Sequence, residues 1–101
     1  MSRPRFDLGR RHEAVLVVSV HGDLDLGSAD DLRSALDRLN GADVLRVDLA
    51  GVRMLDSTAL GVLLAAAQRL SARGGRLELT GSSASVRRVL QIAGLDVVFT
   101  V

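Results

Sequence analysis

The residues with the greatest capacity for chemistry are Asp56, Ser57 and Thr58, which stand just before a long apolar stretch. A carboxylate beside a hydroxyl could serve as a nucleophile with its base, as a phosphate acceptor, or as a helix cap. A catalytic serine also needs a histidine or lysine as its base. The chain contains no lysine, and His12 and His21 belong to a turn and a strand end near the amino terminus. We therefore expect no enzyme activity.

Composition removes further classes of function. The chain has 101 residues and no cysteine, so thiol nucleophiles, disulfides and thiolate metal sites are excluded. Its net charge is +1 and only Phe6 and Phe99 are aromatic, unlike the clustered basic surface of a nucleic-acid-binding protein. No apolar run approaches the ~20 residues that cross a bilayer, and the amino end lacks a hydrophobic signal segment. We expect a cytoplasmic protein with no cofactor, no metal, no nucleic-acid partner and no membrane insertion.

Strand and helix patterns alternate along the chain. Short runs of apolar residues predict strands, most clearly where β-branched residues are frequent as in 14–20, and apolar residues at helical spacing predict helices. The expected strands cover residues 6–8, 14–20, 44–49, 76–80 and 97–101. The expected helices follow Ser28, Asp56, and Ser83 or Ser85. The glycine-containing segment 22–25 is expected to break the second strand, and residues 50–56 to form the loop that leads to Ser57.

This order predicts an α/β fold. Strands joined through helices favour parallel neighbours, whereas the first two strands are close enough in sequence to pair antiparallel. We predict one domain over residues 1–101, with residues 1–5 as a disordered tail. Its mixed, mostly parallel β-sheet packs against α-helices, with the order βαβαβα after an N-terminal antiparallel strand pair. The oligomeric state stays open.

The helix expected over residues 58–73 has two stripes at helical spacing. The stripe expected to face the core consists of Leu60, Leu63, Leu64, Ala67 and Leu70. The second stripe is apolar near Ser57 and basic farther on, and consists of Ala59, Val62, Ala66, Arg69 and Arg73. The second stripe either packs beneath a neighbouring helix or is exposed and receives a partner, and spacing alone leaves both open.

Ser57 itself has two interpretations. A hydroxyl at a helix start normally accepts a hydrogen bond from a free backbone N–H group and caps the helix. The same N–H groups favour anions, so a phosphate on Ser57 would be tolerated without unfolding the domain. If a partner packs over Ala59 and Val62, the added charge would lower its affinity while leaving the fold intact.

The segment from Asp56 to Gly61 resembles the Asp-Ser-(Ser/Thr)-Gly-Leu-Gly signature of bacterial anti-sigma factor antagonists of the STAS type. The resemblance extends over about residues 12–101. The supporting segments are Val20 to Asp25, Ala29 to Leu32, Val47 to Leu49, Met54 to Asp56, Gly74-Gly75, Val86 to Leu90 and Ala93 to Leu95. One departure is Ala59, which stands where the family has glycine.

The resemblance implies a phosphorylation switch. The unphosphorylated antagonist binds an anti-sigma factor, which is often also a serine kinase, and so frees a sigma factor. Phosphorylation of the serine matching Ser57 releases the partner, and a serine phosphatase restores the antagonist. The expected partner-binding residues are Asp23, Asp56, Thr58, Ala59, Val62 and Ala66. The alternative within this fold is a STAS subunit of a lipid-transport ABC complex that binds its ATPase subunit without a phosphoswitch.

Overall fold

The computed structural model describes residues 5–8, 15–39 and 41–92. These residues form four strands and three helices, and after the first two strands each helix is followed by a strand until the last helix. The strands are β1 (Arg5–Leu8), β2 (Val15–Leu24), β3 (Val44–Leu55) and β4 (Arg76–Thr80). The helices are α1 (Ala29–Asp37), α2 (Ser57–Ala72) and α3 (Ala84–Ile92). Arg5, assigned by sequence to the tail, begins β1. The predicted strand over 97–101 and His12 lie outside the described residues.

The strands form one sheet in the order β1-β2-β3-β4. β2, β3 and β4 run parallel, with Val18 opposite Val47 and Val47 opposite Leu79. β1 pairs antiparallel with β2. The parallel strands alternate with the three helices, which confirms the predicted α/β architecture.

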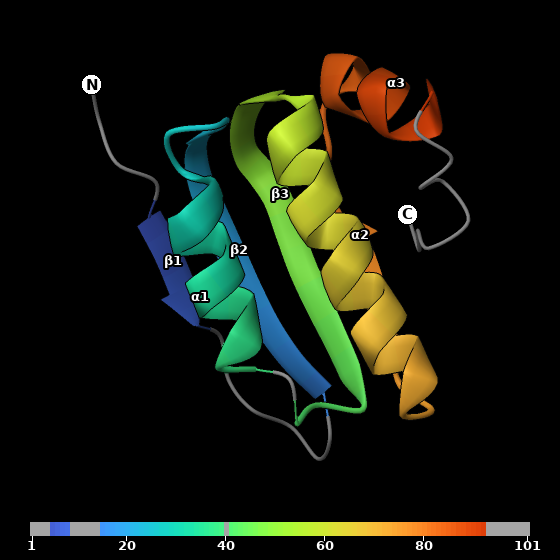
Figure 1. Ribbon diagram of the computed structural model, residues 1–101. Helices are drawn as coiled ribbons and strands as arrows, with labels where there is room; N and C mark the ends of the chain where they lie inside the picture. The colour runs from blue at the N-terminus through green and yellow to red at the C-terminus, as the bar shows by residue number, and fades with distance from the viewer. Residues whose placement is uncertain (1–4, 9–14, 40, 93–101) are drawn as a thin grey trace.

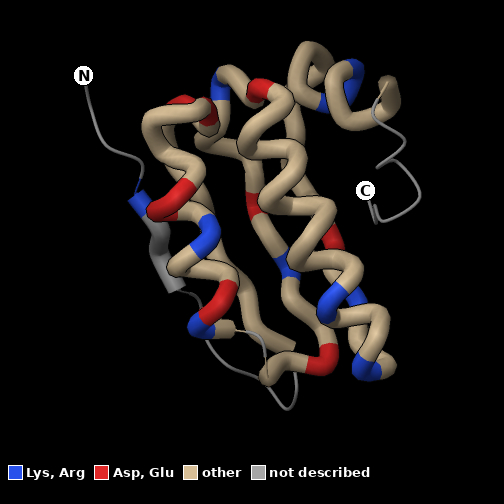
Figure 2. Tube along the Cα trace, viewed as in Figure 1, with Lys and Arg blue, Asp and Glu red and all other residues tan. Residues whose placement is uncertain are grey.

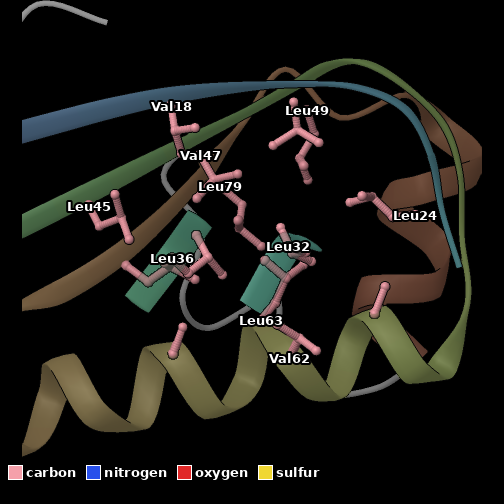
Figure 3. Packing of buried hydrophobic residues seen from close by; sticks show 14 of the residues in the cluster. Val18, Leu24, Leu32, Leu36, Leu45, Val47, Leu49, Val62, Leu63 and Leu79 are labelled. Atoms are coloured by element: carbon pink, nitrogen blue, oxygen red, sulfur yellow. The ribbon is translucent and has the colours of Figure 1, made fainter. Parts of the chain in front are cut away.

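Two helices cover one face of the sheet. In Figure 1, α1 and α2 lie side by side in front of the strands, and α3 lies at the end where β3 passes into α2. Alternate residues of β2, β3 and β4 point into the layer between sheet and helices, among them Val18, Leu45 and Leu79. Figure 3 shows these side chains packed with Leu32 and Leu36 of α1 and Leu63 of α2. The functional segments are therefore carried by a rigid apolar core.

The central strands are longer than predicted. Gly22 does not end β2, because β2 and β3 remain paired as far as Leu24 and Leu55. The pairing contains register shifts between Ser19 and His21 and between Gly22 and Leu24. Gly22 has φ 106°, a conformation that glycine adopts readily and that suits an irregularity in a strand. Residues 50–55 are consequently strand rather than loop.

The predicted core face of α2 is confirmed for Leu63, Ala67 and Leu70, which are buried, but the buried arc is centred about one residue away from the predicted one. Ala59 is 0% exposed, Val62 4% and Ala66 3%, whereas Leu64, assigned to the core, is 41% exposed. The reason is that α2 packs against the sheet and against α1 at once, which turns the buried arc towards the second stripe. Figure 3 draws Val62 and Leu63 together in the buried cluster. Of the two possibilities left open by spacing, packing beneath neighbouring elements is observed for the apolar part of the second stripe, whereas its basic part, Arg69 and Arg73, is exposed.

Candidate functional site

The start of α2 is organised by Asp56. This residue has extended backbone angles, and its Oδ1 accepts a hydrogen bond from the backbone N–H of Ala59 at 3.0 Å. Its own N–H donates to the carbonyl of Leu24 at 3.0 Å, and its carbonyl accepts from the N–H of Leu60. Asp56 is thus the N-cap of the helix and is bonded to the end of β2.

Ser57 is the first residue of α2, and its side chain is exposed. Within the part of the chain that the structure describes, no group forms a hydrogen bond with the Ser57 hydroxyl. Because Asp56 supplies the cap, the interpretation of Ser57 as the helix cap is wrong. An exposed hydroxyl at the positive end of a helix is chemically accessible, and the nearby N–H groups favour an anion there.

A short loop, residues 23–28, lies beside this helix start. The N–H of Leu26 donates to Oδ2 of Asp56 at 3.0 Å, across 30 residues of sequence. Inside the loop, Ser28 Oγ accepts from the N–H of Asp25 and donates to the carbonyl of Asp23. Ser28 is the N-cap residue of α1, but its side chain makes no cap hydrogen bond and instead closes this loop. The loop is therefore fixed by bonds within itself and to Asp56.

The structure separates the predicted partner-binding residues into two groups. Asp23, Asp56 and Thr58 are at least partly exposed near Ser57. Ala59, Val62 and Ala66 are buried, so in this fold their side chains offer almost no surface to a partner, contrary to the expectation that they face one. These three side chains are buried because α2 packs against both the sheet and α1.

Sequence reasoning missed three exposed residues near the site. Gly61 and Leu64 follow Ser57 at helical spacing on the outer side of α2, and Leu26 projects from the loop with 74% of its surface exposed. Since the helix sequence from Ala59 to Ala67 is apolar all round, its periodicity could not identify the outer side. Nothing in the local sequence distinguished Leu26 from a core residue.

Charge is unevenly distributed along the molecule. Figure 2 shows acidic segments on the loop after β2 and at the start of α2, and basic segments near the far end of α2, on α3 and towards the end of β3. Arg53 approaches Asp23, with Nε 3.6 Å from Oδ1, and both side chains are substantially exposed. A phosphate on Ser57 would therefore add negative charge to an end of the molecule that already carries several carboxylates.

Other kinds of site find little support in the described segments. Among residues 5–8, 15–39 and 41–92, no group of His, Cys, Asp or Glu side chains is arranged to hold a metal ion. Of the helices formed by those residues, none has the length and hydropathy needed to span a membrane.

Known proteins resemble this chain in sequence and in fold. The anti-sigma-B factor antagonist of Bacillus subtilis is 36% identical over 88 residues, covering 85% of this chain and 80% of that protein. The antagonist of the same name from Listeria monocytogenes is 36% identical over 81 residues, covering 78% of this chain and 71% of that protein.

Solved structures show the same architecture. An anti-sigma factor antagonist from Mycobacterium paratuberculosis superposes with a TM-score of 0.82 at 28% identity, covering 95% of this chain and 82% of the other. The phosphorylated form of SpoIIAA from Bacillus has a TM-score of 0.76 at 22% identity, covering 95% and 89% of the two chains. The family model of the STAS domain matches residues 9–101. With this match and these relatives, the chain belongs to the STAS-domain family, among homologues named anti-sigma factor antagonists.

Proposed function

We propose that this protein is an anti-sigma factor antagonist controlled by phosphorylation of Ser57. The unphosphorylated form binds an anti-sigma factor that is also a serine kinase, and so frees a sigma factor. Phosphorylation of Ser57 releases the partner, and a serine phosphatase reverses the modification. The protein acts in the cytoplasm as a binding partner and kinase substrate, and it has no catalytic role of its own.

One observation carries this proposal: Ser57 is exposed at the first position of α2 while Asp56 performs the capping. A serine that served only to start the helix would have its hydroxyl bonded to the backbone. Here the hydroxyl is left available to a kinase, and its removal leaves the cap in place. The relatives' names support the same conclusion about the class of partner.

The partner surface differs from the one expected from sequence. We place it on the outer side of α2, formed by Ser57, Thr58, Gly61 and Leu64, with Asp23 and Asp56 at its edge. A partner on this surface covers the Ser57 hydroxyl. A phosphate there brings nearly two negative charges into the interface, and desolvating them lowers affinity without any change of fold.

The test is a parallel capture experiment from native lysate with Ser57→Ala and Ser57→Asp as baits. The expected result is capture of a kinase-like anti-sigma factor by the alanine bait and at least tenfold less by the aspartate bait. Ser71→Asp is the matched control, because Ser71 is an exposed serine near the other end of the same helix. This control should capture as much partner as wild type.

Incubating the captured protein with ATP and wild-type antagonist then identifies the modified residue by mass spectrometry. We expect phosphate on Ser57 of the wild type, none on Ser57→Ala, and phosphate still on Ser57 in Thr58→Ala. Equal capture of a transport ATPase by both baits would contradict the proposal and favour the role of a lipid-transport subunit.

A further inference from the structure

The carboxylate of Asp56 performs two tasks with its two oxygens. Oδ1 caps α2 through the N–H of Ala59, and Oδ2 accepts from the N–H of Leu26, each at 3.0 Å. Capping requires a single acceptor, and serine or asparagine at this position would supply it equally well. Only a carboxylate places a second acceptor on the neighbouring loop, since the other side-chain atom of asparagine is a donor. The type of residue at position 56 is thus explained by both bonds together.

The loop held by this bond presents an apolar side chain to solvent. Leu26 is 74% exposed, although the backbone around it is fixed by Asp56 and by the bonds of Ser28. An apolar side chain on a fixed backbone loses little conformational freedom when a partner covers it, which favours binding. The loop is bonded to the start of α2 through Asp56, so Leu26 adjoins the partner surface proposed on that helix.

We infer that Asp56 is a positioning residue that holds Leu26 beside Ser57, and that Leu26 is a contact that determines which anti-sigma factor the protein accepts. This inference rests on the proposed function, because it extends the same partner surface from α2 onto the loop of residues 23–28. The partner offers an apolar recess to Leu26 next to the groups that approach Ser57. The loop and the helix start then form one surface joined by the Asp56 carboxylate.

The positioning role can be measured in the protein alone. Asp56→Asn keeps a cap for α2 but replaces one of the two acceptors by an amide donor. The expected result by NMR is about tenfold faster hydrogen exchange of the Leu26 N–H, with exchange of the Ala59 and Leu60 N–H groups within about twofold of wild type. Asp37→Asn is the control, because it removes an equal charge from an exposed carboxylate that pairs with Arg69. Unchanged exchange at Leu26 in Asp56→Asn would overturn the positioning role.

The contact role is measured as the dissociation constant for the anti-sigma factor captured by the Ser57→Ala bait, purified and titrated calorimetrically. Leu26→Ser should weaken binding at least tenfold, and Leu26→Met should bind within about threefold of wild type, because it keeps the apolar surface. Asp56→Asn should weaken binding about three- to tenfold. Both Leu26 variants should melt close to wild type, since the side chain is exposed.

The possible failures are distinguishable. If Ser57→Ala captures the anti-sigma factor but Leu26→Ser binds it as tightly as wild type, the inference about Leu26 is overturned and the proposed function stands. If Ser57→Ala captures no anti-sigma factor, the proposed function and the contact role of Leu26 fail together, while the exchange experiment still decides the positioning role of Asp56. If Leu26→Ser loses binding and Leu26→Met retains it, then Leu26 is part of the partner surface and binds through its apolar character.

Discussion

Gly61 lies one helical turn after Ser57 on α2, and a methyl group built at Gly61 would meet no atom within 4 Å beyond the adjacent backbone of its own helix and its two chain neighbours. The helix itself thus has no steric need for glycine at this position. Glycine in a helix interior is less favourable than alanine by up to ~1 kcal/mol. A partner whose backbone approaches α2 beside Ser57 would account for the absence of a side chain.

Gly61→Ala is accordingly expected to stabilise the fold and to weaken partner binding. The free energy of unfolding should rise by ~0.5–1 kcal/mol, measured by urea denaturation. The dissociation constant for the anti-sigma factor should increase at least fivefold, because the new methyl group occupies the contact surface. Gln68→Ala, at another exposed position of α2, should change neither quantity appreciably. Equal stabilisation with unchanged binding would remove Gly61 from the partner surface.

Substitutions at the two adjacent residues of the helix start should differ in their effect on stability. The free energy of unfolding of Ser57→Ala should lie within ~0.5 kcal/mol of the wild-type value, because Asp56 caps α2 and the Ser57 side chain is exposed. Asp56→Ala should lose ~1–2 kcal/mol, since both the cap and the bond to Leu26 disappear. For a domain of this size, that loss lowers the melting temperature by roughly 4–16 °C. The reverse order of stabilities would show that Ser57 is the structural residue.

Val62 and Leu64 lie on opposite sides of α2, one buried and one exposed, so we expect opposite effects when each is replaced by glutamate. Val62→Glu should fail to fold, because it places a carboxylate at a position that is 4% exposed, at a cost of more than about 4 kcal/mol. Leu64→Glu should fold with stability within ~1 kcal/mol of wild type and should lose the partner. Circular dichroism and thermal melting compare the two variants. A folded Val62→Glu variant would contradict the observed packing.

The architecture could be predicted from sequence because its signals are local. The valine-containing start of β3, the long apolar stretch of α2, the glycine pair after α2 and the alternating leucines of β4 mark these elements without reference to other parts of the chain. The alternation of strands with helices then favours parallel pairing. The exposed position of Ser57 could not be derived in this way. It depends on Asp56 taking the cap, and both residues are capable of capping a helix.

The errors arise where tertiary packing decides. In α2 the residues from Ala59 to Ala67 are apolar on every side, so the packing of α2 against α1 and the sheet determines that Val62 is buried and Leu64 is exposed. Gly22 marked a strand end in the sequence, whereas in the fold it permits an irregularity within a continuing strand. The bond between Asp56 and Leu26 joins segments 30 residues apart and has no local signature at all.

Glu78 on β4 is expected to make the stability of the fold depend on pH. Its side chain is only 4% exposed, and it accepts hydrogen bonds from Nε of Arg76 at 2.9 Å and Nε of Arg46 at 3.0 Å. The hydrogen bond from Arg76 is the largest cause that lowers the pKa of Glu78, burial opposes it, and Arg46 lowers the pKa further. The folded protein therefore binds a proton at Glu78 less readily than the unfolded chain does.

A pKa lowered by folding stabilises the native state above the unfolded pKa of glutamate, about 4.3, and this contribution is lost as the pH falls from there through the folded pKa. Glu78→Gln should therefore be less stable than wild type at pH 7 by ~1–3 kcal/mol, and the difference should shrink at pH values below about 4. Urea denaturation of both proteins between pH 3 and pH 7, in about half-unit steps, measures the difference between their free energies of unfolding. Asp30→Asn, which breaks an exposed ion pair with Arg33, should remain close to wild type throughout. Wild-type and Glu78→Gln curves that stay parallel over the whole range would show that folding does not lower the pKa of Glu78.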